Sequence, residues 1–77
     1  MKALIIGCGN IGGMYDINNN EYKSYAKSFS KLNINFDIFD PDTVKAEIIS
    51  KAYNVNIIEN LDNFILKKYN TFVIASP

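Results

Sequence analysis

Three glycines near the start of the chain have the spacing of a phosphate-binding loop. Gly7, Gly9 and Gly12 fit Gly-x-Gly-x-x-Gly, directly after an apolar run at residues 3–6. The first glycine permits a tight turn, the second lets backbone approach a pyrophosphate, and the third lets the following helix pack closely on the strand. Backbone N–H groups and the helix dipole supply the positive field, so no lysine is needed. We expect the pyrophosphate to contact Gly7, Gly9, Asn10, Ile11 and Gly12.

Two other interpretations of this glycine loop stay open. The glycines can serve only a tight turn and close packing of strand and helix. Methyltransferases also use a glycine-rich first turn, although with a looser glycine pattern. A Walker-type phosphate loop is excluded, because no Gly-Lys-Ser/Thr follows the glycines.

An acidic residue, Asp40, stands at the end of the second predicted strand. A carboxylate there accepts hydrogen bonds from ribose hydroxyls and repels a 2′-phosphate. No Lys or Arg occurs in residues 41–43, so the pattern favours NAD over NADP. Asp40 lies farther from the glycines than the usual interval of about 20 residues, and the polar segment 16–21 accounts for most of the excess. The alternative role for Asp40 is that of a helix N-cap only.

Apolar runs and helical spacings alternate along the chain. We expect strands at 3–6, 34–39, 55–58 and 72–75. Helices are predicted over 22–32, after an N-cap at Asp40, and after an N-cap at Asn60. This alternation predicts an α/β fold, a Rossmann-like doubly wound parallel sheet of four strands in the order 3-2-1-4 with three crossover helices, as an incomplete domain.

The same spacings predict which side chains of the first two helices are buried. Residues three and four positions apart share one face of a helix. In the first helix this face carries Tyr22, Tyr25, Ala26, Phe29 and Leu32, and in the second it carries Val44, Ile48, Ile49 and Ala52.

The last two residues, Ser76 and Pro77, follow the fourth predicted strand. In the doubly wound order this strand returns to the far side of the first, which opens a crevice at their carboxyl ends. Ser76 and Pro77 are therefore expected to line the bound cofactor. The simpler alternative is that Ser-Pro only ends the strand, because proline cannot donate to the ladder.

The composition excludes several kinds of site and partner. Eight Lys or Arg balance eight Asp or Glu, so no basic field exists to hold nucleic acid or an anionic membrane. One Cys and no His exclude clustered zinc ligands and a Cys–His nucleophile. An extended strand separates Asp37, Asp40 and Asp42 too far for simple chelation, so we expect no metal site. With no signal-peptide core and no apolar span of about 20 residues, a cytoplasmic protein is expected.

Three stretches together resemble the N-terminal domain of the Gfo/Idh/MocA oxidoreductases: residues 2–13, Phe39-Asp40-Pro41-Asp42 and residues 73–77. Residues 14–16 and 24–27 are similar to a branch often associated with bacterial surface-sugar pathways. The resemblance implies NAD(P)-dependent oxidation or reduction of a carbinol or carbonyl on a sugar or cyclitol. It implies that the cofactor is lined by Gly7, Gly9, Gly12, Asp40, Ser76 and Pro77. The family's catalytic Lys, in a Glu-Lys-Pro motif, has no counterpart in these residues, so no catalytic residue is assigned.

Two function classes follow for residues 1–77 as the N-terminal part of a dinucleotide-binding domain. The leading hypothesis is the NAD-binding segment of an oxidoreductase that acts on a sugar-like alcohol or ketone. The alternative is a non-enzymatic NAD-sensing module, similar to regulatory domains attached to ion transport systems. The predicted sheet leaves one face partly uncovered and the fourth strand as an edge. We therefore expect either a homo-oligomer or a segment excised from a longer polypeptide.

Overall fold

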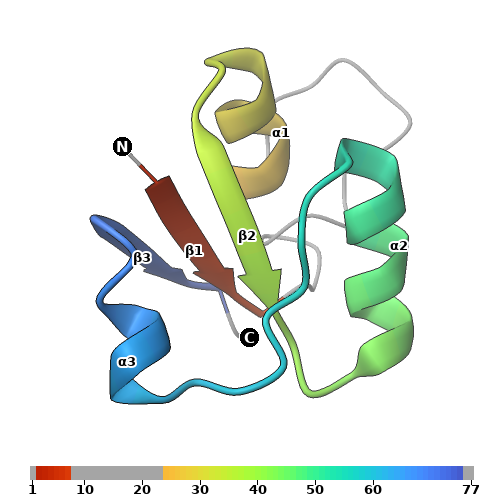
Figure 1. The fold of residues 1–77 in the computed structure, drawn as a ribbon. Coiled ribbons are helices and arrows are strands. Elements are labelled where there is room, and N and C mark those ends of the chain that lie inside the picture. The colour runs from red at the N-terminus through yellow and green to blue at the C-terminus, as the bar shows by residue number, and fades with distance from the viewer. Residues whose placement is uncertain (1, 8–23, 76–77) are drawn as a thin grey trace.

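The computed structural model describes residues 2–7 and 24–75, in which strands and helices alternate except at one point. The elements are β1 (Lys2–Ile6), α1 (Tyr25–Lys31), β2 (Asn35–Phe39), α2 (Thr43–Tyr53), α3 (Asn63–Leu66) and β3 (Thr71–Ile74). The three strands form one parallel sheet in the order β2-β1-β3 (Figure 1). The α/β class and the parallel sheet agree with the sequence-based prediction.

The expected strand over residues 55–58 is not a strand of this sheet. Its only bridge is an isolated parallel one between Ile57 and Ile38 of β2. Two hydrogen bonds accompany the bridge, from Ile38 N to Asn56 O at 3.0 Å and from Ile58 N to Ile38 O at 2.8 Å. The segment thus touches the side of β2 away from β1 at one point, and the described sheet has three strands instead of four.

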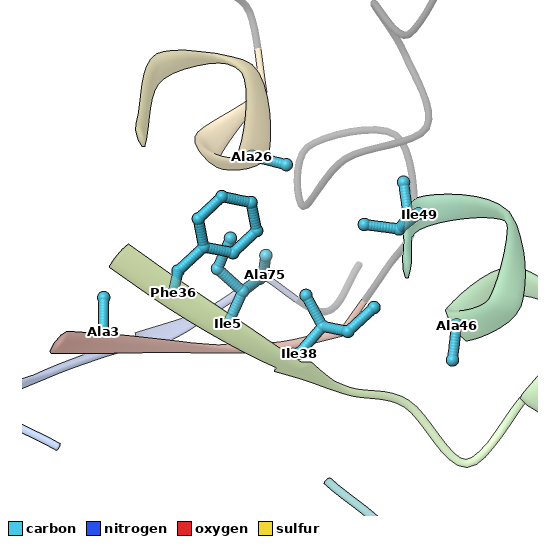
Figure 2. Close-up of a cluster of buried hydrophobic side chains, with 8 residues drawn as sticks. All are labelled: Ala3, Ile5, Ala26, Phe36, Ile38, Ala46, Ile49 and Ala75. Carbon is cyan, nitrogen blue, oxygen red and sulfur yellow. The ribbon is translucent and has the colours of Figure 1, made fainter. Parts of the chain in front are cut away.

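The main core lies between the sheet and the two longer helices. Figure 2 shows Ile5 of β1 and Ile38 of β2 pointing toward Ala26 of α1 and Ile49 of α2. All four side chains are fully buried. Burial of each Ile stabilises the fold by about 1.5–3 kcal/mol relative to exposure. Helices α1 and α2 therefore cover one face of the sheet, whereas α3 lies on the other (Figure 1).

A chain of aromatic rings links these helices to β2. The ring centroids of Phe29 and Phe36 are 5.9 Å apart, and those of Phe36 and Tyr53 are 6.2 Å apart. These tilted and edge-on arrangements are the favoured geometries for aromatic pairs. Phe36, a strand residue, thus contacts one ring from each helix.

Helix α1 begins at the buried Ser24, whose hydroxyl accepts a hydrogen bond from Lys27 N at 3.1 Å. Its buried face differs from the predicted one. Tyr25 and Leu32 are 42% and 69% exposed, so their predicted burial is wrong. Lys27 is buried instead, with its ammonium 5.9 Å from the centre of the Tyr53 ring. The helix ends at Lys31, so Leu32 no longer shares its face.

Helix α2 has its N-cap at Asp42, so the prediction of Asp40 as the cap is wrong. The Asp42 carboxylate accepts from Val44 N at 3.1 Å and from Lys45 N at 3.3 Å. The buried residues of α2 are Ala46 and Ile49. The predicted stripe is correct at Ile49 and wrong at Val44, Ile48 and Ala52, which are exposed. Only a narrow stripe of α2 is therefore fully buried.

The short helix α3 is capped by Asp62 and not by the predicted Asn60. The Asp62 carboxylate accepts from Ile65 N at 2.8 Å. None of the residues in α3 is buried, and Phe64 is 74% exposed. Within residues 2–7 and 24–75, no helix combines the length and apolar character needed to cross a membrane.

Candidate functional site

The carboxyl ends of all three strands meet at one edge of the sheet, because the strands are parallel. Gly7 follows β1, Asp40 follows β2 and Ala75 follows β3. Gly7 N donates to Phe39 O at 2.8 Å, and Ala75 N donates to Ile6 O at 2.8 Å. The first bond continues the pairing of β1 with β2, and the second continues the pairing of β1 with β3, each by one residue beyond the strands. Two predicted site residues, Gly7 and Asp40, are therefore neighbours at this edge.

The backbone at Gly7 has a φ of 104°, a value that strongly favours glycine. A side chain there would place Cβ against the neighbouring backbone. Glycine is therefore the residue type that adopts the backbone found at position 7 without strain. The predicted tight turn after Gly7 involves residues outside those that the structure describes.

The Asp40 side chain is held by the backbone that follows it. Its Oδ1 accepts a hydrogen bond from Asp42 N at 2.8 Å, which closes a small turn before α2. The residue is half-buried at the end of β2. The Asp40 carboxylate is therefore held in place at the sheet edge. The residue that caps α2 is Asp42.

The strand order reverses beside this edge. The chain passes from β1 to β2 on one side, and β3 then pairs with the opposite side of β1. In open α/β sheets such a reversal separates the loops on either side and leaves a crevice at the carboxyl ends of the strands. The reversal lies between β1 and β3, next to Gly7 and Ala75.

The remaining predicted site residues lie outside the residues that the structure describes: Gly9, Asn10, Ile11, Gly12, Ser76 and Pro77. Among the described residues, Gly7 and Asp40 are brought together at one edge, and Ala75 directly precedes Ser76. The described ranges hold no group of three or more His, Cys, Asp or Glu side chains that could bind a metal ion.

A second polar cluster, which the sequence did not lead us to expect, lies on the face of the sheet opposite the main core. The Tyr69 hydroxyl donates to Asp37 Oδ2 at 2.6 Å, and Lys2 Nζ lies 3.1 Å from the same oxygen. Asp37 and Tyr69 are only 5% and 8% exposed. Burial and the hydrogen bond to Asp37 raise the pKa of the Tyr69 phenol above its ordinary value. A phenol of raised pKa keeps its proton at neutral pH, so the Tyr69 hydroxyl stays a hydrogen-bond donor to Asp37.

One signal in the sequence could have revealed the cluster. Asp37 is a charged residue in the middle of an apolar strand, and a buried carboxylate requires a hydrogen-bonding or charged partner. Its partners Lys2 and Tyr69 are remote in sequence, so the residue types alone did not identify them.

A hollow of about 380 Å³ lies at the opposite, amino-terminal side of β2. Its lining includes Asn33 and Asn54, whose φ values are 57° and 55°. Asparagine tolerates this left-handed backbone better than most residues do. The local backbone therefore explains why asparagine stands at both positions. The hollow is separate from the edge that carries Gly7 and Asp40.

Comparisons with protein-family models, with curated proteins and with solved structures found no match to this chain.

Proposed function

We propose that this chain binds NAD as the cofactor-binding segment of an oxidoreductase that acts on a sugar-like alcohol or ketone. The observation that carries the proposal is that Gly7, in a backbone conformation that favours glycine, and Asp40 follow neighbouring strands at one edge of the sheet. The strand order reverses at the same edge. A nucleotide site of the Rossmann type combines these three features.

The diphosphate of the nucleotide would be bound by main-chain N–H groups that follow β1. Gly7 has a φ of 104°, and the sequence continues from it into Gly9 and Gly12. Two glycines at these positions leave the backbone accessible to phosphate oxygens. Main-chain amides would have to balance the charge of the diphosphate, since no Lys or Arg occurs between residues 7 and 13.

The adenosine ribose would be bound by Asp40. Its Oδ1 is already fixed by Asp42 N, so the carboxylate needs little reorganisation to accept ribose hydroxyls. The negative charge disfavours the 2′-phosphate of NADP, which supports NAD as the cofactor.

The bridge between Ile57 and Ile38 of β2 supports a Rossmann-type strand order for the sheet. The Ile57 bridge lies on the side of β2 away from β1. In a Rossmann-type half with strand order 3-2-1-4, the third strand pairs at that position. We propose that residues 55–58 correspond to this strand, reduced here to one bridge.

In the proposed enzyme the nicotinamide would supply hydride transfer, while this chain binds and orients the cofactor. Orientation of a hydride donor against its substrate lowers the barrier by removing translational and rotational freedom before reaction. We assign no acid–base residue within this chain.

Calorimetric titration of the full chain with NAD and with NADP tests the proposal. Gly9→Val should abolish NAD binding, because its side chain would occupy the position of the phosphates. Asp40→Asn keeps an oxygen that can accept from Asp42 N but removes the charge. A hydrogen bond to a charged group contributes about 1.5–3 kcal/mol. Its loss should weaken NAD binding by roughly 10- to 150-fold. The variant should also discriminate less against NADP.

Glu59→Gln is the matched control, since it removes an exposed carboxylate from the loop before α3. It should leave NAD affinity unchanged. NAD affinity that is equal in wild type, Gly9→Val and Asp40→Asn would overturn the proposal. Tight binding of S-adenosylmethionine in place of NAD would instead support the methyltransferase interpretation of the loop.

A further inference from the structure

The start of helix α2 follows closely after Asp40, the residue proposed to bind the adenosine ribose. β2 ends at Phe39 and α2 begins at Thr43, so a short turn joins the strand to the helix. In NADP the 2′-phosphate is attached to that ribose, so it would lie beside this turn. The groups that the turn offers to a phosphate therefore bear on the choice of cofactor.

Main-chain N–H groups of this turn are already bound by carboxylates. Asp42 N donates to Asp40 Oδ1 at 2.8 Å. Val44 N and Lys45 N donate to Asp42 Oδ1 at 3.1 Å and 3.3 Å. Unpaired N–H groups at the start of a helix are the groups that bind phosphate. A phosphate would have to displace a carboxylate to use the N–H groups of Asp42, Val44 and Lys45.

The Asp42 carboxylate also opposes the favourable charge of the helix start. The aligned peptide dipoles place about half a positive charge there, and an ionised carboxylate outweighs it. Asp42 and Lys45 are both exposed, and within residues 2–7 and 24–75 neither forms an ion pair. Without the charge of Asp42, the helix dipole and the Lys45 ammonium would both favour a phosphate at this position.

We infer that Asp42 is a second specificity-determining residue of the proposed nucleotide site, which excludes the 2′-phosphate of NADP. This inference rests on the proposed binding of NAD. The two aspartates have different tasks. Asp40 would accept hydrogen bonds from the ribose, whereas Asp42 would occupy the N–H groups of α2 and repel a phosphate. NAD carries a hydroxyl in place of the 2′-phosphate, so the charge of Asp42 acts mainly against NADP.

The size of the effect follows from Coulomb's law. Two like unit charges about 7 Å apart in water repel one another enough to weaken binding about threefold. A phosphate monoester carries nearly two charges at neutral pH. Removal of the Asp42 charge should therefore raise the affinity for NADP, relative to that for NAD, by roughly 5- to 10-fold.

Calorimetric titration of the full chain with NAD and with NADP, at about 20 mM NaCl, tests the inference. Asp42→Asn removes the charge, and asparagine caps a helix as well as aspartate does. The bond from the N–H of residue 42 to Asp40 is a main-chain bond, so the substitution retains it. The ratio of NADP affinity to NAD affinity should rise by roughly 5- to 10-fold. Asp42→Ser, which supplies a different capping oxygen, should give the same rise.

The dependence on salt separates an effect of charge from an effect of structure. At about 500 mM NaCl, charges at this distance are largely screened, so the rise in the affinity ratio should shrink. A rise of the same size at both salt concentrations would contradict a role through charge.

Asp62→Asn is the matched control. Asp62 caps α3, on the other face of the sheet (Figure 1), and its carboxylate accepts from Ile65 N at 2.8 Å. This variant should leave the affinity ratio unchanged. A wild type that binds neither nucleotide would overturn the proposed function and this inference with it. A wild type that binds NAD, with an affinity ratio that is the same in Asp42→Asn or rises equally in Asp62→Asn, would overturn this inference alone.

Discussion

Removal of the Tyr69 hydroxyl is expected to destabilise the protein strongly for so small a change. The hydroxyl donates to Asp37 Oδ2 at 2.6 Å, and both residues are more than nine-tenths buried, at 8% and 5% exposure. A hydrogen bond to a charged group contributes about 1.5–3 kcal/mol. Tyr69→Phe keeps the ring and its edge-on contact with Phe72. The free energy of unfolding should therefore fall by about 2 kcal/mol, which lowers Tm by roughly 8–16 °C for a domain of this size.

Urea and thermal denaturation, followed by circular dichroism, measure this loss. Tyr25→Phe is the matched control, because Tyr25 is 42% exposed, and its loss should stay within about 0.5 kcal/mol. A double-mutant cycle with Asp37→Asn isolates the energy shared by Tyr69 and Asp37. Equal losses in Tyr69→Phe and Tyr25→Phe would refute the reasoning, as would additive effects in the cycle.

The same contact predicts a dependence on alkaline pH. Burial and the hydrogen bond to Asp37 raise the pKa of Tyr69 in the folded state above its ordinary value of 10.0. The folded state thus holds the phenolic proton more tightly than the unfolded chain does. The stabilisation is complete below about pH 10 and declines as the pH rises further. The difference in unfolding free energy between wild type and Tyr69→Phe should be constant from about pH 7 to pH 9 and shrink above about pH 10.

Two further predictions concern backbone geometry. Gly7→Ala should lower the free energy of unfolding by about 1–2 kcal/mol, because φ at this residue is 104°; an unchanged urea midpoint would show that this backbone conformation accepts a side chain. Asp42→Ala should cost about 1 kcal/mol through loss of the α2 N-cap, whereas Asp62→Ala, at the cap of the four-residue and unburied α3, should cost less. Urea denaturation ranks the two, and the reverse order would contradict this comparison.

The α/β class and the three main strands could be predicted from residue types, because these depend on local patterns. Residues 3–5 are apolar and buried on both faces of the sheet, as an uninterrupted apolar run predicts. The helix caps were less predictable. Asp40 and Asp42 both suit an N-cap, and only the turn in which Asp40 accepts from Asp42 N decides between them.

Tertiary structure decided which side chains are buried and which residues meet. Helical spacing predicts a face, but the narrow sheet covers only part of it, so Val44 is exposed while Ile49 is buried. The contact of Tyr69 with Asp37 joins residues 32 positions apart, and no local pattern contains that information. Gly7 and Asp40 were expected at one site because parallel strands place their carboxyl ends together, and the β2-β1-β3 order makes them neighbours. Pairing between strands depends on the whole sheet, so it is specified by tertiary structure and not by either residue alone.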